Sequence, residues 1–396
     1  MSPTASTPIT ADHQGAARTH AAPRADVPGG GEVLTMGVEE EFLLVDRHTR
    51  APVGRGPRVI EAASRTLGPL VQPEFFTAQV EVCTTPTTSP AALRAQLAGL
   101  RAELVGAAAG EGCLLLAAGT TVIRPERALT VTRDARYRSI ASHVAPILGN
   151  YDRVVCGCHV HVGVSSRAEA LDLANRMRPW LPSLQALAAN SPFDRGRDTG
   201  YASWRAVEHA RWPTVGPAPV LDEAAYERVA DALVRSGAVL DRRMIYWFAR
   251  PSEHVPTLEI RVADVNARID TVVLLAVLVR GLAATLRAEA AEGRPAPDLE
   301  FARLSEAHRR AAVHGLDGEG LDPVSGAGAA AWDLITRLRA EAAPGLAAAG
   351  DLSLADALLD RVRTEGGGSA QQRAAHRRRG RLSDVVDGLA EAVSTA

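Results

Sequence analysis

Four short segments of the chain alternate polar or charged side chains with aliphatic ones at a period of two residues. Successive side chains of a β-strand point to opposite faces of its sheet, so each segment would form a strand with one charged and one apolar face. The paired polar positions are Glu39 with Glu41, Gln79 with Glu81, His159 with His161, and Glu259 with Arg261. The pattern therefore predicts one sheet with an apolar back and a charged front that binds a polyvalent cation.

Glu40 is the exception to this pattern, because alternation places its carboxylate on the apolar face. The other side chains expected on that face are Phe42 and Leu44, Val80 and Val82, Val160, Val162 and Val164, and Leu258, Ile260 and Val262. These apolar side chains are predicted to contact the hydrophobic core.

The composition is that of a globular protein, because 396 residues with 46% hydrophobic content can build a large core. The formal net charge of -2 provides no general attraction for nucleic acid or an anionic membrane, so neither is expected as a partner. The four cysteines are too few and too dispersed for a disulfide framework. This cysteine usage favours a reducing compartment, and we expect a cytoplasmic location.

Residues 1–34 are rich in Pro, Ala, Thr and Gly without an apolar run, so they are predicted to be a disordered leader. They carry no recognisable secretory signal. Residues 35–396 are expected to form a single domain. The longest apolar stretch, residues 272–286, is interrupted by Arg280 and is short for a membrane span, so we expect a buried helix there.

Several predicted strands lie close together before a run of helices occupies the C-terminal part of the chain. This order favours an α+β fold over a doubly wound sheet. A helix is expected at Pro90–Gly110 after an N-cap at Ser89, followed by a buried strand at residues 114–118. Further helices are expected at residues 167–190, 222–235, 269–293 and 383–393. We expect a long functional loop between residues 190 and 219 and a flexible link at residues 366–373.

Carboxylates and imidazoles gathered on facing strands are typical ligands of divalent cations. Oxygen ligands favour Mg²⁺ or Mn²⁺, and imidazole also accepts Mn²⁺ or Zn²⁺. The alternatives are a solvated edge strand at Glu39 and Glu41, and core histidines that bond to the backbone. A zinc site that joins the histidines to Cys156 and Cys158 is disfavoured, because alternation places the cysteines on the opposite face.

Glu259 and Arg261 place an anion and a cation side by side on one face. On a protein surface, such an ion pair contributes little to stability. Beside a metal site, the carboxylate can hold an ion while the guanidinium binds a phosphate oxygen. The arginines at residues 377–379 and 381 have two interpretations, a solvated turn or a phosphate contact.

Seven motifs in a fixed order resemble the carboxylate-amine ligase family related to glutamate-cysteine ligase, type 2. They are GVEEEF from residue 37, QVEVCTTP from 79, CGCHVHV from 156, ANSPFDRGRDTG from 189, RPSEHVPTLEIRVAD from 250, AVHGLDG from 312 and GGGSAQQR from 366. The motifs extend from residue 36 to about residue 385. Their shared order makes the resemblance specific, although no single motif would.

The resemblance implies an antiparallel sheet curved into a funnel of the glutamine-synthetase or guanido-kinase type, with helices packed on its outer face. It also implies that ATP binds the polar face with Mg²⁺ or Mn²⁺. The implied metal ligands are Glu39, Glu41, Glu81, His159 and Glu259. Catalysis would depend on Glu81, Glu259 and Arg261, with Arg261 stabilising phosphate. The implied nucleotide or substrate contacts are His161, Ser203, Arg205, Gln372 and Arg373.

The implied reaction is ATP-dependent formation of an amide, in which a carboxylate attacks the γ-phosphate and an amine then displaces phosphate from the acyl phosphate. Small-molecule carboxylate and amine substrates, such as glutamate and cysteine, and a homodimer are expected on the same basis. Phe248 departs from the resemblance, because many relatives have Asp at the position that follows Trp247. A different carboxylate or amine is therefore a second hypothesis.

Three other functions stay open at the level of sequence. The same fold type can transfer phosphate to nitrogen, which would make the protein a phosphotransferase. A zinc or manganese hydrolase built around His159 and His161 would turn over without ATP. A regulatory homologue would bind nucleotide without turnover, although every expected carboxylate is present.

Overall fold

The computed structural model describes residues 33–149 and 151–395. These residues belong to one compact unit, Val33–Ala396. The leader predicted at residues 1–34 falls almost wholly outside the described residues, so it stays a prediction. The assignment of residues 35–396 to a single catalytic domain likewise stays a prediction.

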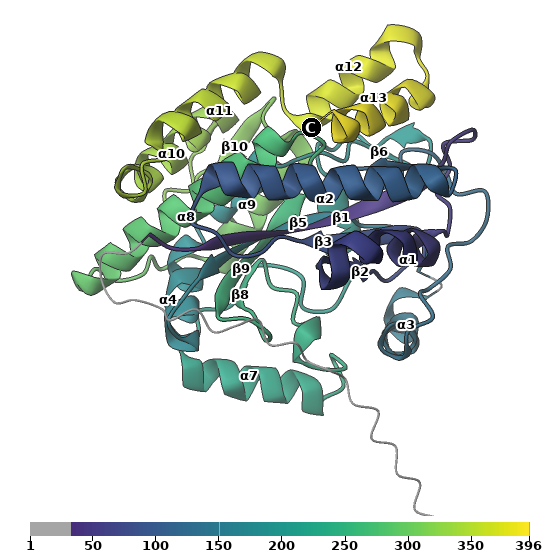
Figure 1. The fold of residues 1–396 in the computed structure, drawn as a ribbon. Helices are drawn as coiled ribbons and strands as arrows, with labels where there is room; N and C mark the ends of the chain where they lie inside the picture. The colour runs from purple at the N-terminus through teal and green to yellow at the C-terminus, as the bar shows by residue number, and fades with distance from the viewer. Residues whose placement is uncertain (1–32, 150, 396) are drawn as a thin grey trace, which may run out of the picture. The chain divides into compact units, whose positions relative to one another are not determined.

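All four predicted strands form, and they are neighbours in one seven-stranded sheet (Figure 1). In order across the sheet they are β3 (Gln79–Cys83), β1 (Met36–Asp46), β5 (Gly157–Gly163) and β9 (Thr257–Asp264). The other strands are β2 (Val71–Pro73) beside β3, β8 (Ala249–Pro251) beside β9, and β4 (Cys113–Leu116) beside β1. Every one of these pairings is antiparallel, which confirms the predicted α+β class with an antiparallel sheet.

The strand register places the polar positions of neighbouring strands directly opposite one another. The opposed pairs are Glu41 with Glu81, Glu39 with His159, and His161 with Glu259. Directly opposed residues share a face of the sheet, with Cβ atoms about 5 Å apart. The register therefore gathers side chains from four strands into one cluster.

Helices cover the apolar face of the sheet, as predicted (Figure 1). Helix α2 (Pro90–Gly110) begins at Ser89, whose side chain accepts a hydrogen bond from the Ala92 amide, and it packs against β4. Helix α8 (Ile269–Ala291) packs against β5 and β1. Among the described residues, α8 is long and apolar enough to cross a membrane by composition, but most of it is buried inside the protein. The prediction of a buried core helix is therefore confirmed.

The remaining elements follow along the chain. The helices are α1 (Gly56–Leu67), α3 (Ala135–Leu148), α4 (Arg167–Met177), α5 (Leu181–Leu187), α6 (Trp204–His209), α7 (Glu223–Arg235), α9 (Phe301–His314), α10 (Ala331–Ala348), α11 (Leu352–Glu365), α12 (Gly368–Arg379) and α13 (Leu382–Ser394). Two 3₁₀ turns are η1 (Gly68–Leu70) and η2 (Arg242–Met244). Two small hairpins pair β6 (Phe193–Asp194) with β7 (Arg197–Asp198), and β10 (Glu319–Leu321) with β11 (Gly328–Ala330).

One predicted helix is divided in the structure. The segment expected to be helical over residues 167–190 forms two helices, α4 and α5. Pro179 and Pro182 lie at the break, and proline has no amide hydrogen for the helical hydrogen bond. The strand expected at residues 114–118 also differs slightly, because β4 ends at Leu116.

Two segments predicted to be irregular contain regular structure. The prediction of a flexible link at residues 366–373 was wrong, because most of this segment lies in α12. The buried Gln372 side chain of this helix bonds to Asn190, a tertiary contact that local sequence does not reveal. The long loop expected between residues 190 and 219 holds β6, β7 and α6.

The exceptional Glu40 lies on the apolar face, as alternation predicts, and its side chain is fully buried. Arg101 of α2 pairs with it, at 2.5 Å between Nη2 and Oε1 and 3.0 Å between Nε and Oε2. The same guanidinium donates to the carbonyls of Asn266 and Ala267 at 2.7 and 2.6 Å. This buried pair therefore joins β1, α2 and the segment that follows β9.

Helices α8 and α10 cross at two glycines, Gly281 and Gly345. A Cβ atom at Gly345 would overlap the backbone carbonyl of Gly281. Because the obstacle is backbone, we expect Gly345→Ala to lower the free energy of unfolding by about 1–3 kcal/mol in urea denaturation. Gly99→Ala in α2 is the matched control, since nothing lies within 4 Å of the added methyl, and it should raise stability by about 0.5–1 kcal/mol. An equal increase in the free energy of unfolding for both variants would contradict the close contact between α8 and α10 at Gly345.

Candidate active site

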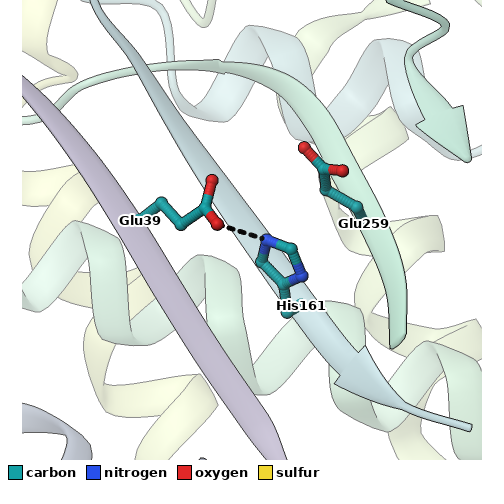
Figure 2. Close-up of side chains that lie close together, drawn as sticks. All are labelled: Glu39, His161 and Glu259. Atoms are coloured by element: carbon teal, nitrogen blue, oxygen red, sulfur yellow. Dashed lines mark ion pairs between the residues drawn. The ribbon is translucent and has the colours of Figure 1, made fainter. Parts of the chain in front are cut away.

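Side chains from three strands meet on the charged face of the sheet. Figure 2 shows Glu39 of β1, His161 of β5 and Glu259 of β9, whose nearest ligand atoms all lie within 4.8 Å of one another. His161 Nε2 lies 3.2 Å from Glu39 Oε1, and His159 Nδ1 lies 3.0 Å from Glu39 Oε2. The other ring nitrogen of His161 lies 2.8 Å from the Thr257 hydroxyl, which fixes the ring.

A second group of ligands lies beside the first. Glu41 and Glu81 are joined by Glu74, from the link between β2 and β3, and one oxygen of each lies within 4.8 Å of the others. Glu39 and Glu81 form a further such group with Cys83. Shared members make the groups continuous across four strands. We call the following set the acidic row: Glu39, Glu41, Glu74, Glu81, His161 and Glu259.

Crowding of the carboxylates shifts their pKa values. Burial, together with the charges of Glu39 and Glu74, raises the pKa of Glu81 well above its usual range. Burial and the charge of Glu41 raise the pKa of Glu74 to about 7. Burial and the neighbouring carboxylates therefore disfavour the ionised forms of Glu74 and Glu81, and a bound divalent cation would favour those forms.

Glu259, at the other end of the acidic row, has the opposite environment. Burial disfavours its ionisation, but the charges of Arg261 and Arg250 outweigh this and hold the pKa of Glu259 well below its usual range. Arg250 Nε donates to Glu259 Oε2 at 2.9 Å, and Arg261 forms a second ion pair with the same carboxylate. Glu259 is therefore ionised at neutral pH and orients two guanidinium groups.

A cavity of about 260 Å³ lies beside Glu41, Glu74 and Glu81. Its other walls carry arginines and aromatic rings, among them Arg205, Arg250, Arg261, Trp212 and Tyr246. The buried Nε atoms of Arg205 and Arg261 have no hydrogen-bond partner among the described residues. Buried donors are nearly always satisfied in native proteins, and an anionic group bound in the cavity would provide acceptors for these two.

The ligand set of the acidic row fits a divalent cation. It consists mainly of carboxylate oxygens, together with imidazole nitrogen. Mn²⁺ accepts both kinds of ligand, whereas Mg²⁺ prefers the oxygens. The Nε2 atoms of His159 and His161 are buried and lie 3.6 Å from Glu41 and 3.2 Å from Glu39, but within residues 33–149 and 151–395 neither contact has the geometry of a hydrogen bond. In the same part of the chain, no group of close metal ligands includes Cys156 or Cys158, because both thiols are buried in apolar clusters. The disfavoured zinc arrangement with these cysteines does not form.

Three residues predicted to contact nucleotide or substrate lie outside this cavity. Ser203 caps α6 and donates to the buried Asp264 carboxylate at 2.8 Å. Gln372 of α12 bonds to the segment that precedes β6. Arg373 pairs with Asp198 of β7 at 2.7 Å. The structure brings Arg205 and Arg261 to the cavity but does not bring these three side chains there.

Two other features singled out in the sequence also lie elsewhere. The arginines at residues 377–379 form the exposed end of α12, and Arg379 pairs with Asp384 at 2.6 Å. The Phe248 ring packs against His308, with 4.6 Å between ring centres, and contacts the apolar core. Phe248 is not among the residues that line the cavity.

Glu74, Arg250 and the aromatic wall were not predicted from the sequence. Glu74 lies between two strands, where no alternation marks the direction of its side chain. Arg250 lies directly opposite Glu259, but β8 is only three residues long and shows no clear period. A search for basic residues near the fourth polar segment would have suggested Arg250. Trp212 and Tyr246 carry no comparable signal.

Comparison with known proteins supports the resemblance seen in the motifs. The chain matches the model of glutamate-cysteine ligase family 2 over residues 35–388. A relative from Salinispora tropica, provisionally named glutamate–cysteine ligase 2, is 43% identical over 343 residues, which cover 86% of this chain and 90% of the relative.

Two solved structures share the fold. The glutamate–cysteine ligase of Francisella tularensis, solved in complex with AMP, has a TM-score of 0.67 at 13% identity, over 92% of this chain and 89% of that one. A bifunctional glutathione synthetase from Pasteurella multocida has a TM-score of 0.65 at 16% identity, over 91% of this chain and 52% of that one. Because the family model matches most of this chain and the fold is shared, the chain belongs to the glutamate-cysteine ligase family 2.

Proposed function

We propose that the protein is an ATP-dependent carboxylate–amine ligase that forms an amide through an acyl phosphate, with glutamate and cysteine as the leading substrates. Its family consists of carbon–nitrogen ligases by name. The observation that carries the proposal is the acidic row beside a cavity that contains two unpartnered guanidinium donors. The Francisella tularensis enzyme of the same fold binds AMP, which supports a nucleotide substrate here.

The acidic row offers two places for a divalent cation. One group is Glu39, His161 and Glu259, and the other is Glu41, Glu74 and Glu81. His159 stands between them, 3.0 Å from Glu39 and 3.6 Å from Glu41, and would orient or complete both groups. Mg²⁺ or Mn²⁺ held there would supply positive charge to the phosphates and to the substrate carboxylate.

The proposed reaction has two steps. A carboxylate oxygen of the first substrate bonds to the γ-phosphorus of ATP while the bond to the bridging oxygen breaks, which releases ADP. The amine nitrogen of the second substrate then attacks the acyl carbon, phosphate departs, and the nitrogen loses a proton. No side-chain nucleophile takes part. The protein therefore contributes positioning and charge compensation.

Arg261 is suited to bind the phosphoryl group. Its guanidinium is held by the Glu259 carboxylate and lies 5.7 Å from the centre of the Tyr246 ring. Guanidinium remains charged at any working pH, and its planar donors match two oxygens of a phosphate. Glu259 and Tyr246 therefore fix Arg261 before the reaction begins, so little reorganisation is needed as negative charge develops.

The proposal is tested by ADP release from Mg-ATP with a panel of carboxylates and amines, and by mass spectrometry of the products. ADP formed only when both substrates are present, with a condensed product, would support the ligase and name its substrates. A stable phosphorylated product without any need for amine would indicate a phosphotransferase, and turnover without ATP would indicate a hydrolase. No ATP consumption with any pair would contradict the proposal.

Mg²⁺ should stabilise the folded protein even without turnover, because it would relieve repulsion within the acidic row. A ligand present at about 100 times its Kd stabilises the folded state by about 2.7 kcal/mol. We expect added MgCl₂ to raise the melting temperature, EDTA to reverse the rise and stop ADP release, and Glu81→Gln to reduce the rise. Glu253→Gln, in the turn between β8 and β9, is the control that should keep it. An equal rise in the Glu81 variant would contradict its role as a ligand.

We also propose a cytoplasmic location and a homodimer. Cys83, Cys113, Cys156 and Cys158 are all free thiols, which suits a reducing compartment. The homodimer rests on the family resemblance alone, and light scattering of the purified protein would measure the assembly.

A further inference from the structure

Asp264, the last residue of β9, faces the charged side of the sheet because of a β-bulge. Val160 pairs with Ile260 and Cys158 pairs with Ala263, so two residues of β9 oppose the single residue between them on β5. An extra residue in one strand reverses the alternation beyond it. Asp264 is consequently opposite Gly157 on the charged face, although a regular strand would turn it toward the core.

The buried Asp264 carboxylate holds the beginning of α6. It accepts hydrogen bonds from the Asn190 amide at 2.8 Å, the Ser191 hydroxyl at 2.6 Å and the Ser203 hydroxyl at 2.8 Å. Ser191 in turn accepts a hydrogen bond from the Arg205 amide at 3.0 Å, and Ser203 is the N-cap of α6. Both oxygens of Asp264 therefore fix the backbone that carries Arg205.

The Arg205 side chain lies between Asp264 and the cavity. Its Nη1 is 3.9 Å from Asp264 Oδ1, and its Nη2 donates to the Arg261 carbonyl at 3.4 Å. The guanidinium lies over Gly157, where a Cβ atom would be 3.0 Å from Arg205 Cζ and still closer to Nη2. Arg205 therefore lies beside the Asp264 carboxylate and over a glycine that leaves room for its guanidinium.

The same network includes Gln372, for which the family resemblance implied a ligand contact. The Gln372 amide donates to the backbone and side-chain oxygens of Asn190 at 2.8 and 2.7 Å. Asn190 also donates to the carbonyls of Ala117 and Val265 at 2.9 and 2.7 Å. Fully satisfied buried networks of this kind hold one arrangement of side chains. Gln372 thus secures Asn190, which bonds to Asp264.

We propose that Asp264 is a positioning residue that holds Arg205 over Gly157, with its guanidinium directed at an anionic group of the ligand in the cavity. Its kinetic consequence rests on the proposed ligase function. Asp264→Asn keeps the shape of the side chain but removes the charge that faces Arg205 and replaces one acceptor with a donor. Misplacement of a binding group by about 1 Å can cost about 100-fold in rate, so we expect a loss of that size in kcat/KM.

A double-mutant cycle tests whether Asp264 acts through Arg205. Asp264→Asn should cost much less in the Arg205→Lys background than in the wild type, because the group that it positions is already altered. Equal losses in both backgrounds would overturn the proposal. Asp351→Asn is the matched control, because Asp351 is also buried and pairs with Arg280 far along the chain from α6. It should lower the melting temperature without changing kcat/KM.

Gly157→Ala provides a second test if Asp264→Asn does not fold. Its added methyl group would clash with the same guanidinium, so it should also couple to Arg205→Lys, and full additivity would count against the proposal. Crystal structures of the wild type and either variant separate this inference from the proposed function. Absence of ADP release in the wild type would contradict the ligase, whereas Arg205 unmoved in the variant would overturn the positioning role. Displacement of Arg205 would support that role in either case.

Discussion

Glu259→Gln should reduce turnover at least about 1,000-fold, equivalent to about 4 kcal/mol of transition-state stabilisation, while the protein stays folded. The substitution keeps the shape of the side chain but removes the negative charge that would help to bind a cation and that now orients Arg261. ADP release under saturating Mg-ATP measures the effect. We expect the fold to be retained, because Arg250 keeps its hydrogen bonds to the carbonyls of Arg243 and Ile245. Circular dichroism checks this expectation.

Glu253→Gln is the control for this prediction. Glu253 lies in the turn between β8 and β9, where it bonds to Tyr226 at 2.6 Å and Arg167 at 3.4 Å, away from the acidic row. Its variant should retain wild-type turnover. Calorimetry with Mn²⁺ adds a measurement that does not depend on activity, because Glu259→Gln should weaken or remove one binding event. A folded Glu259 variant with wild-type turnover would exclude this carboxylate from the site.

Arg101→Met should have the largest effect on stability, about 3–5 kcal/mol, measured as the free energy of unfolding in urea. Arg101 is 1% exposed and Glu40 is fully buried, so the substitution leaves a carboxylate in the core without its counter-charge. It also leaves the carbonyls of Asn266 and Ala267 without their donor.

The double variant with Glu40→Leu and Arg101→Met distinguishes loss of the ion pair from loss of packing. If the uncompensated charge is the main cost, removing it should restore much of the stability, because an apolar pair can replace a buried ion pair at little cost. The double variant is then expected to be more stable than Arg101→Met alone. Equal or lower stability would contradict this explanation and assign the effect to packing or to the two carbonyls.

The strands and their faces could be predicted because alternation is a local property. A residue's place in a strand fixes the face to which it points, so Glu39, His161 and Glu259 could be assigned to one side of a sheet without knowledge of their neighbours. The same rule placed Glu40 on the apolar side, where it lies. It could not predict that Arg101 pairs with Glu40, because Arg101 is far along the chain and is brought there only by the packing of α2.

Local rules failed where the backbone departs from regular geometry or where distant segments meet. The bulge in β9 turned Asp264 to the charged face, and no residue type in β9 predicts that a bulge forms there. Glu74 joined Glu41 and Glu81 from a link between strands, where direction has no period.

The sequence by itself determined the charged strands, the family and the class of chemistry, because these depend on residue type at fixed local spacing. The tertiary structure alone decided which carboxylates and imidazoles lie close together, that Arg205 and an aromatic wall line the cavity, and that Gln372 bonds to Asn190. Those features depend on strand register and on contacts between residues far apart in the chain. Free energies summed over the whole packed molecule set these contacts, and no short segment encodes them.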